Sequence, residues 1–193
     1  MSLFNQAKIH LRITRTHDIA RRYFVVNGFD GALTMLGLIL GFTVSTPASL
    51  TVIINVCLGA AIALGMSGVS SAYISEAAER KRALDKLEEA MVTDLHDSTH
   101  GEAARRVPWL IALINGSAPL VTSILILTPI WLANIGIPLP VSPLYLAIIV
   151  ALMLIFFLGV FLGRIAGISW LRSGIQTLLV AVVTAALIYL FTG

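Results

Sequence analysis

The chain has 193 residues, of which 58% are hydrophobic and only 12% charged, with a mean hydropathy of +0.92. Soluble domains carry about 25% charged residues, so this composition predicts one integral membrane domain. The net charge of +3 comes from thinly spread basic residues and indicates no nucleic-acid partner, and the single cysteine, Cys57, excludes a disulfide framework or a cysteine metal cluster.

Residues 1–22 are predicted to form an amphipathic N-terminal helix on the membrane surface. Leu3 and Leu11 belong to its apolar side, whereas Arg12 and Arg15 belong to its basic side. A helix of this kind is held by burial of its apolar face and by anionic lipid. No cleavable signal peptide is expected here, because no short apolar core follows the basic residues.

Five apolar stretches are long enough to cross a bilayer, which takes about 20 residues. They lie at about 23–44, 51–75, 108–133, 143–163 and 168–191. The links after the first and third stretches are uncharged, so all 13 lysines and arginines fall on one side of the membrane. The positive-inside rule then places the N-terminus in the cytoplasm and the C-terminus outside. The predicted fold is an all-α, five-span transmembrane bundle over residues 23–193.

The segment 76–106 is the only sizeable polar element between the spans. Apolar residues such as Leu84, Leu87 and Met91 recur there at helical spacing among charged ones. We expect the second span to continue into the cytoplasm as a helix and then fold back. Gly101 is expected to break the helix before the third span.

Asp30 is the only acidic side chain inside the apolar stretches. A carboxylate in a membrane helix costs about 2.5–3.5 kcal/mol on insertion scales, so it indicates a functional site. Asn27 and Thr34, three residues before and four after it, share its helix face and predict a polar strip along a permeation path. The alternative is a protonated or hydrogen-bonded Asp30 that only holds helices together.

Two further spans offer candidate metal ligands. Met66 in the second span carries a thioether, which favours transition metals over Ca²⁺ or Mg²⁺, although a methionine in an apolar helix is more often a packing residue. Asn115 in the third span precedes Pro119, which removes a backbone donor and can expose a carbonyl to a cavity.

The cytoplasmic segment offers a second set of candidate ligands. His96 and His100 are four residues apart and would project from one face of a helix. The full set of candidates there is Glu76, Glu79, Glu88, Glu89, Asp94, His96 and His100. The alternative is a solvated charged helix crossed by pairs such as Glu76 with Arg80.

Enzyme motifs are not apparent in this sequence: it shows no phosphate loop, no nucleophile motif and no paired intramembrane carboxylates. We therefore expect neither catalysis nor a resident cofactor.

Several segments resemble the vacuolar iron transporter (VIT) family of Fe²⁺ and Mn²⁺ transporters. They are Asn27–Thr34 (NGFDGALT), Met66–Ser75, Asn115–Leu120 (NGSAPL) and the stretch GIQTLLVA from Gly174. The resemblance implies a homodimeric carrier that moves Fe²⁺ or Mn²⁺ out of the cytoplasm in exchange for protons. It also implies that Asp30 lines the pathway at the metal site.

The chain departs from the family pattern in two places. In an alignment on Tyr73, the family's second-helix glutamate falls at Ala60 and its methionine at Gly68. The large cytoplasmic metal-binding domain of the plant members is reduced here to the segment 76–106. These departures predict one of three things: altered ion selectivity, weaker coupling to protons, or a distant relative with a different substrate.

The function predicted from the sequence is export of Fe²⁺, Mn²⁺ or both by proton antiport. Because one carboxylate cannot hold a cation and a proton together, the two would compete for Asp30. The expected location is the cell membrane of a prokaryote, or the vacuolar membrane of a eukaryote. The alternative is a non-transporting membrane scaffold in which Asp30 makes a structural hydrogen bond and the segment 76–106 binds a partner.

Overall fold

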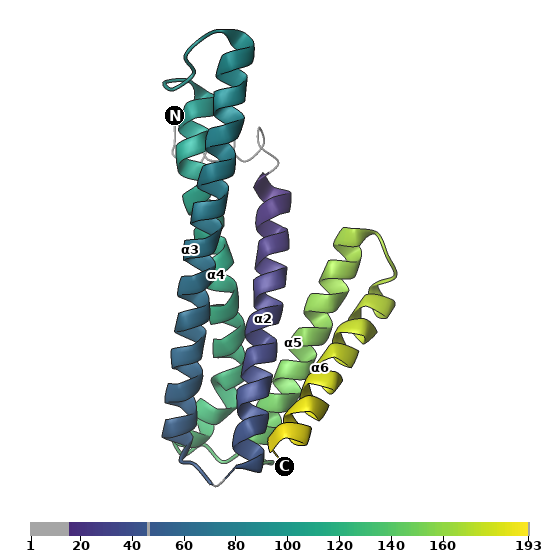
Figure 1. The fold of residues 1–193 in the computed structure, drawn as a ribbon. Helices are drawn as coiled ribbons and strands as arrows, with labels where there is room; N and C mark the ends of the chain where they lie inside the picture. The colour runs from purple at the N-terminus through teal and green to yellow at the C-terminus, as the bar shows by residue number, and fades with distance from the viewer. Residues whose placement is uncertain (1–15, 46, 193) are drawn as a thin grey trace. The chain divides into compact units, whose positions relative to one another are not determined.

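A computed structural model describes residues 16–45 and 47–192. These residues form the helices α2 (Thr16–Val44), α3 (Leu50–Met91), α4 (Thr99–Asn134), α5 (Pro143–Ala166) and α6 (Trp170–Thr192) (Figure 1). Each helix contains a stretch long and apolar enough to cross a membrane, so the prediction of an all-α chain with five spans is confirmed. The orientation in the membrane and the homodimer remain predictions.

The helices α2 and α3 extend beyond their apolar stretches. The helix α3 runs on to Met91, and the chain then folds back into α4, as the periodicity predicts. The helix α2 begins at Thr16, so residues 16–22 continue directly into the first span. The rest of the predicted N-terminal surface helix lies outside the described residues.

The prediction that Gly101 breaks the helix is wrong, because α4 already begins at Thr99. Ser98 caps the new helix: its Oγ accepts the N–H of Gly101 at 3.3 Å. Gly101 is needed for close approach instead, since a Cβ there would lie 2.6 Å from the Leu95 carbonyl oxygen and would also meet that of His96.

The described residues divide into two compact units. The first unit comprises residues 16–24 and 66–117, and the second comprises residues 25–65 and 118–192, without residue 46. The helices α2, α3 and α4 each contribute to both units, whereas α5 and α6 lie wholly in the second.

The first unit packs the α3 and α4 segments around a small apolar core. Ala72, Val107 and Ile111 are buried in it, with Ile19 and Tyr23 packed against them. The amide nitrogen of buried Asn115 donates to the Gly68 carbonyl oxygen at 2.8 Å, which ties α4 to α3. A Cβ on Gly68 would lie 3.3 Å from the Gly116 Cα, so the two backbones approach closely at this point.

The second unit contains the larger core and the α5–α6 hairpin, whose two helices lie side by side in Figure 1. Every fourth residue of α5 is buried, and the series ends in Gly159 and Gly163. Thr177 of α6 packs directly on Gly159, and its hydroxyl donates to the Ile155 carbonyl oxygen at 3.1 Å. The missing side chain at Gly159 therefore sets the separation of the two helices.

Candidate functional site

Asp30 lies on α2 in the second unit, and its side chain is exposed. It borders a hollow of about 120 Å³ whose remaining lining is almost entirely apolar. The lining residues are Val25, Val26, Phe29, Asp30, Leu158, Gly159, Leu162 and Thr177. Within the described part of the chain, the structure records no hydrogen bond or ion pair to the Asp30 carboxylate. A carboxylate in a span thus faces a small hollow rather than a protein cation.

Gly31, the next residue, fixes the direction in which Asp30 points. A Cβ on Gly31 would lie 2.7 Å from both the Pro119 Cα and the Thr122 hydroxyl oxygen, so α2 and α4 are in backbone contact there. Gly28, one turn earlier, packs on Thr122 and Leu158. Successive residues point about 100° apart around a helix. Because the glycine face of α2 packs on α4, Asp30 points to a different side of α2.

Asn27 and Thr34 lie on the turns of α2 that flank Asp30, as the spacing predicts. The Thr34 hydroxyl donates to the backbone carbonyl oxygen of Asp30 at 2.8 Å, not to its carboxylate. Asn27 is half-buried. A threonine that bonds back to the preceding turn keeps a hydroxyl oxygen available as an acceptor.

Met66 and Asn115, the other candidates within the spans, belong to the first unit. The Met66 side chain is 61% exposed, so it is not a core packing residue of this chain. Asn115 is buried and donates to Gly68 across the α3–α4 contact. Ligand roles for the two remain predictions.

Glu76, predicted as a metal ligand or a solvated pair partner, is buried. Its side chain is 5% exposed and its Oε2 lies 3.4 Å from the Nε of Arg80. The pairing with Arg80 predicted as the alternative is confirmed, but the solvation is not. Glu76 follows Ala72 by one turn, so it lies on the face of α3 that packs in the core of the first unit.

The histidine pair is not arranged as the spacing predicts. His96 lies in the turn before α4, where its backbone N–H donates to the Asp94 carboxylate at 2.7 Å, and only His100 is helical. The two residues therefore do not share a helix face. A turn closed by the Asp94 side chain stands where the first helical turn was expected. They border different hollows, His96 one of about 480 Å³ and His100 one of about 120 Å³.

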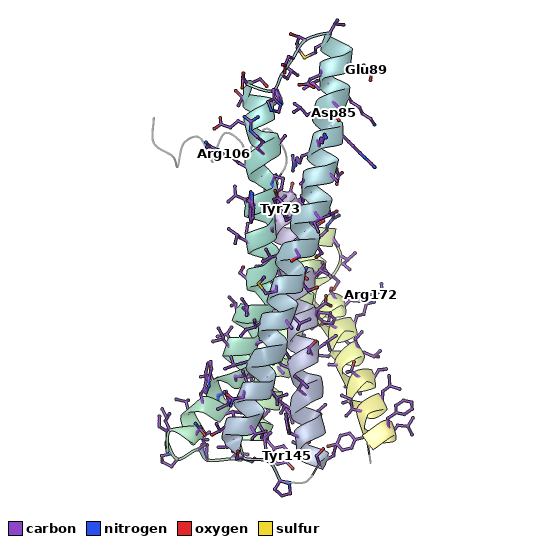
Figure 2. The ribbon with its side chains drawn as sticks, turned by 60° about the vertical axis from the view of Figure 1, so that its left-hand side comes forward. Tyr73, Asp85, Glu89, Arg106, Tyr145 and Arg172 are labelled. Atoms are coloured by element: carbon purple, nitrogen blue, oxygen red, sulfur yellow. The ribbon has the colours of Figure 1, made fainter. Side chains whose placement is uncertain are left out.

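The remaining acidic candidates lie near the end of α3. Glu88 accepts the N–H of Leu95 at 2.9 Å and so closes the α3–α4 turn. Glu79 and Glu89 are exposed, and Figure 2 shows Glu89 one turn beyond Asp85 on α3. Among the described residues, no three His, Cys, Asp or Glu side chains gather closely enough to hold a metal ion. The ligand role of this set remains a prediction.

Sequence reasoning missed a hollow of about 480 Å³, which the first unit forms beside the α3–α4 turn. Trp109 and Tyr73 stand on its wall with ring centroids 4.4 Å apart, and charges of both signs surround them. The full lining is Tyr73, Ala77, Lys81, Leu84, Asp85, Glu88, His96, Gly101, Ala104, Arg105, Pro108 and Trp109. The aromatic pair comes from residues 36 positions apart, so no local spacing could indicate it.

The fold and the apolar stretches define a multi-pass integral membrane protein. Comparison with known proteins then gives its family: the profile of the VIT family matches residues 77–193, which is more than half of the chain. The chain belongs to the VIT family. Membership makes it a protein of a metal-ion transporter family, not an enzyme family. The matched range begins within α3, so it does not include Asp30.

One related protein is similar to this chain over a longer range than the family profile, so the similarity extends toward the N-terminus. An uncharacterized protein of Methanocaldococcus jannaschii is 32% identical over 172 residues, which cover 88% of this chain and 86% of that protein. No solved structure matches the chain.

Proposed function

We propose that this protein moves Fe²⁺, Mn²⁺ or both out of the cytoplasm by proton antiport, with Asp30 as the shared metal and proton site. The observation that carries the proposal is the Asp30 carboxylate itself. It is the only acidic side chain in the apolar stretches, it is exposed, and it faces a hollow. Charged groups within spans commonly mark ion pathways and proton relays.

Three features of the site support this function. The glycine contact with α4 holds α2 in place, so Asp30 has a rigid support. Thr34 places a hydroxyl oxygen one turn away. The scaffold alternative requires a structural hydrogen bond from the carboxylate, and in the described residues the structure records none. Oxygen ligands at such a site suit a divalent cation.

Antiport follows from competition at this one carboxylate. A bound divalent cation stabilises the ionised form, whereas the apolar surroundings favour the neutral form. A carrier that releases the metal on one side therefore rebinds a proton there before it returns. We expect transport in this scheme to slow at low pH on the side where metal binds.

Metal flux into proteoliposomes tests the proposal. Wild-type protein and Asp30→Asn are compared with Fe²⁺, Mn²⁺ and Ca²⁺, with a pH-sensitive dye inside the vesicles. We expect Fe²⁺ or Mn²⁺ flux with counter-moving protons from the wild type. The Asp30→Asn variant should fall to the level of empty liposomes, because an amide cannot exchange a proton for a metal ion.

Asp85→Asn is the matched control, since it makes the same chemical change on α3 outside the apolar stretch. It should transport like the wild type. Undiminished flux from a folded Asp30→Asn protein would refute the role of Asp30. Absence of flux from a folded wild type would instead support the scaffold alternative.

A further inference from the structure

The α5–α6 hairpin carries a second large hollow, of about 440 Å³, which shares no lining residue with the hollow beside Asp30. It lies wholly in the second unit and combines aromatic rings with a single charged group. Its lining residues are Phe156, Phe157, Val160, Phe161, Arg164 and Trp170. None of them has a part in the proposed transport site.

Helix geometry explains why a hollow forms here. Phe157, Val160, Phe161 and Arg164 follow the spacing i, i+3, i+4 and i+7, so they form one stripe on α5. The ring of Phe156 lies over Gly174 of α6, where a Cβ would be 2.5 Å from its Cε2 atom. The stripe remains outside this contact: Phe157 is 62% exposed and Phe161 44% exposed.

The length of the hollow matches one leaflet of a bilayer. From Phe156 to Arg164 the α5 axis rises about 12 Å, at 1.5 Å per residue. Half of the hydrocarbon core is about 15 Å thick. Trp170 is 52% exposed at the Arg164 end, at the first residue of α6. Tryptophan concentrates at the headgroup level, so the polar end of the hollow lies where lipid headgroups lie.

The charge at this end has one sign only. The turn from Arg164 to Arg172 contains no acidic residue, and Asp30 is the only acidic residue in the whole second unit. Arg164 is exposed, and within the described residues the structure records no carboxylate partner for it. An arginine with five fixed donors suits a phosphate, which can accept two of its hydrogen bonds together.

We propose that this hollow is a binding site for one anionic phospholipid of the leaflet at the α5–α6 turn. Arg164 binds the phosphate, Trp170 lies beside the headgroup, and an acyl chain packs along Phe157, Val160 and Phe161. Basic pockets at helix ends bind anionic headgroups in this manner. Lipid binding at this site does not require the transported ion, so it can be tested separately from the function of Asp30.

Competition between two lipids in native mass spectrometry tests this site. Purified protein receives equal amounts of dioleoyl phosphatidylglycerol and dioleoyl phosphatidylcholine, which differ only in the headgroup. We expect wild-type protein to retain phosphatidylglycerol preferentially. Arg164→Gln should reduce that preference about fivefold, the factor for one basic residue near the membrane surface. Phe161→Ala should weaken retention of both lipids, because it shortens the apolar wall.

Arg172→Gln is the matched control. It removes the same charge from the same turn, and Figure 2 shows Arg172 near the start of α6, projecting away from the ribbon. Its lipid preference should remain that of the wild type. Glycerophosphate, the headgroup without chains, should not displace the bound lipid.

Three results would overturn the proposal. Equal retention of the two lipids by the wild type means an ordinary lipid annulus. Equal losses from Arg164→Gln and Arg172→Gln mean a diffuse surface charge rather than a site. Displacement by glycerophosphate means a site for free phosphate and not for a lipid. Thermal unfolding of each variant confirms that the folded protein is being compared.

Discussion

The α3–α4 and α5–α6 hairpins close in the same way but are charged differently. The N–H of Thr93 bonds to the Glu88 carbonyl oxygen after α3, and that of Ile168 bonds to the Gly163 carbonyl oxygen after α5. Both are six-to-one bonds around a residue in the left-handed conformation. Each hairpin also borders a hollow with a tryptophan on its wall. The first helix of each hairpin therefore ends with the same backbone hydrogen-bond pattern.

The hollows differ in how their charges are matched. The hollow of the α3–α4 hairpin has both signs, and Glu88 and Arg105 bond to the backbone of the turn at Leu95 and His96. The hollow of the α5–α6 hairpin has only Arg164. Charges that bond within their own hairpin stabilise its fold. A single cation without an acidic residue beside it can instead bind an external anion.

Removing one charge from each hairpin should have unequal effects on stability. Glu76→Gln removes the buried carboxylate that pairs with Arg80, which is 14% exposed, in the α3–α4 hairpin. Loss of one member of a buried pair typically costs about 3 kcal/mol. Arg164→Gln should change stability by less than about 0.5 kcal/mol, because it breaks no internal pair. Thermal unfolding in detergent measures both effects.

The partly exposed pair of Glu102 with Arg106 provides a control within the first unit, since it has the same spacing and a distance of 2.8 Å. Glu102→Gln should cost less than about 1 kcal/mol, as exposed pairs do. If Glu76→Gln is no more damaging than Glu102→Gln, Glu76 is not a structural charge, and its predicted role as a metal ligand becomes the better account.

The second contrast concerns how closely the helices of each hairpin approach. Gly159→Ala would place a methyl group against the β-branched Thr177, whose Cβ is 2.9 Å from the new atom. Overpacking of this kind costs about 1–3 kcal/mol. Gly68→Ala would place a methyl group 3.3 Å from the Gly116 Cα and 3.5 Å from two atoms of Asn115, so a small shift of α3 can accommodate it. We expect a clearly larger fall in unfolding temperature for Gly159→Ala.

The second substitution Thr177→Ala tests that explanation, because it removes the hydroxyl and methyl groups that Gly159→Ala would meet. The double variant should recover part of the stability that Gly159→Ala loses, beyond the sum of the single effects. Additive losses would show that the glycine matters for some reason other than contact with Thr177.

The course of the chain could be predicted from sequence because its signals are local. Apolar length identified the five spans, and the spacing of Leu84, Leu87 and Met91 predicted that α3 continues beyond the membrane and folds back. These depend on residues within a few turns of one another, and hydropathy reports them directly.

The side-chain environments could not be predicted in the same way, because they depend on packing between distant residues. Glu76 reads as a surface charge, yet its side chain is buried. Gly101 reads as a helix breaker, yet it allows the carbonyl groups of the turn to approach α4. Asp30 is the intermediate case: hydropathy identifies it, but only the structure shows that Gly31 contacts Pro119 and Thr122.

The smallest contrast lies in the two residues that end α3 and α5. Gly167 adopts φ = 70° at no steric cost, whereas Val92 adopts φ = 50° with a branched side chain that is 91% exposed. A left-handed residue other than glycine costs roughly 1–2 kcal/mol. Val92→Gly should therefore raise stability by about 1 kcal/mol and Gly167→Ala should lower it by a similar amount. Differential scanning of the purified variants measures both.

Ala90→Gly serves as the control for Val92→Gly, since it places the same residue two positions earlier, within α3. It should lower stability by up to about 1 kcal/mol, because glycine is a poor helix former. Opposite signs for these two glycine substitutions would identify the backbone conformation at Val92 as the cause. A loss at both positions would mean that the Val92 side chain stabilises the turn, and the two hairpins would then differ in their backbone closure as well as in their charges.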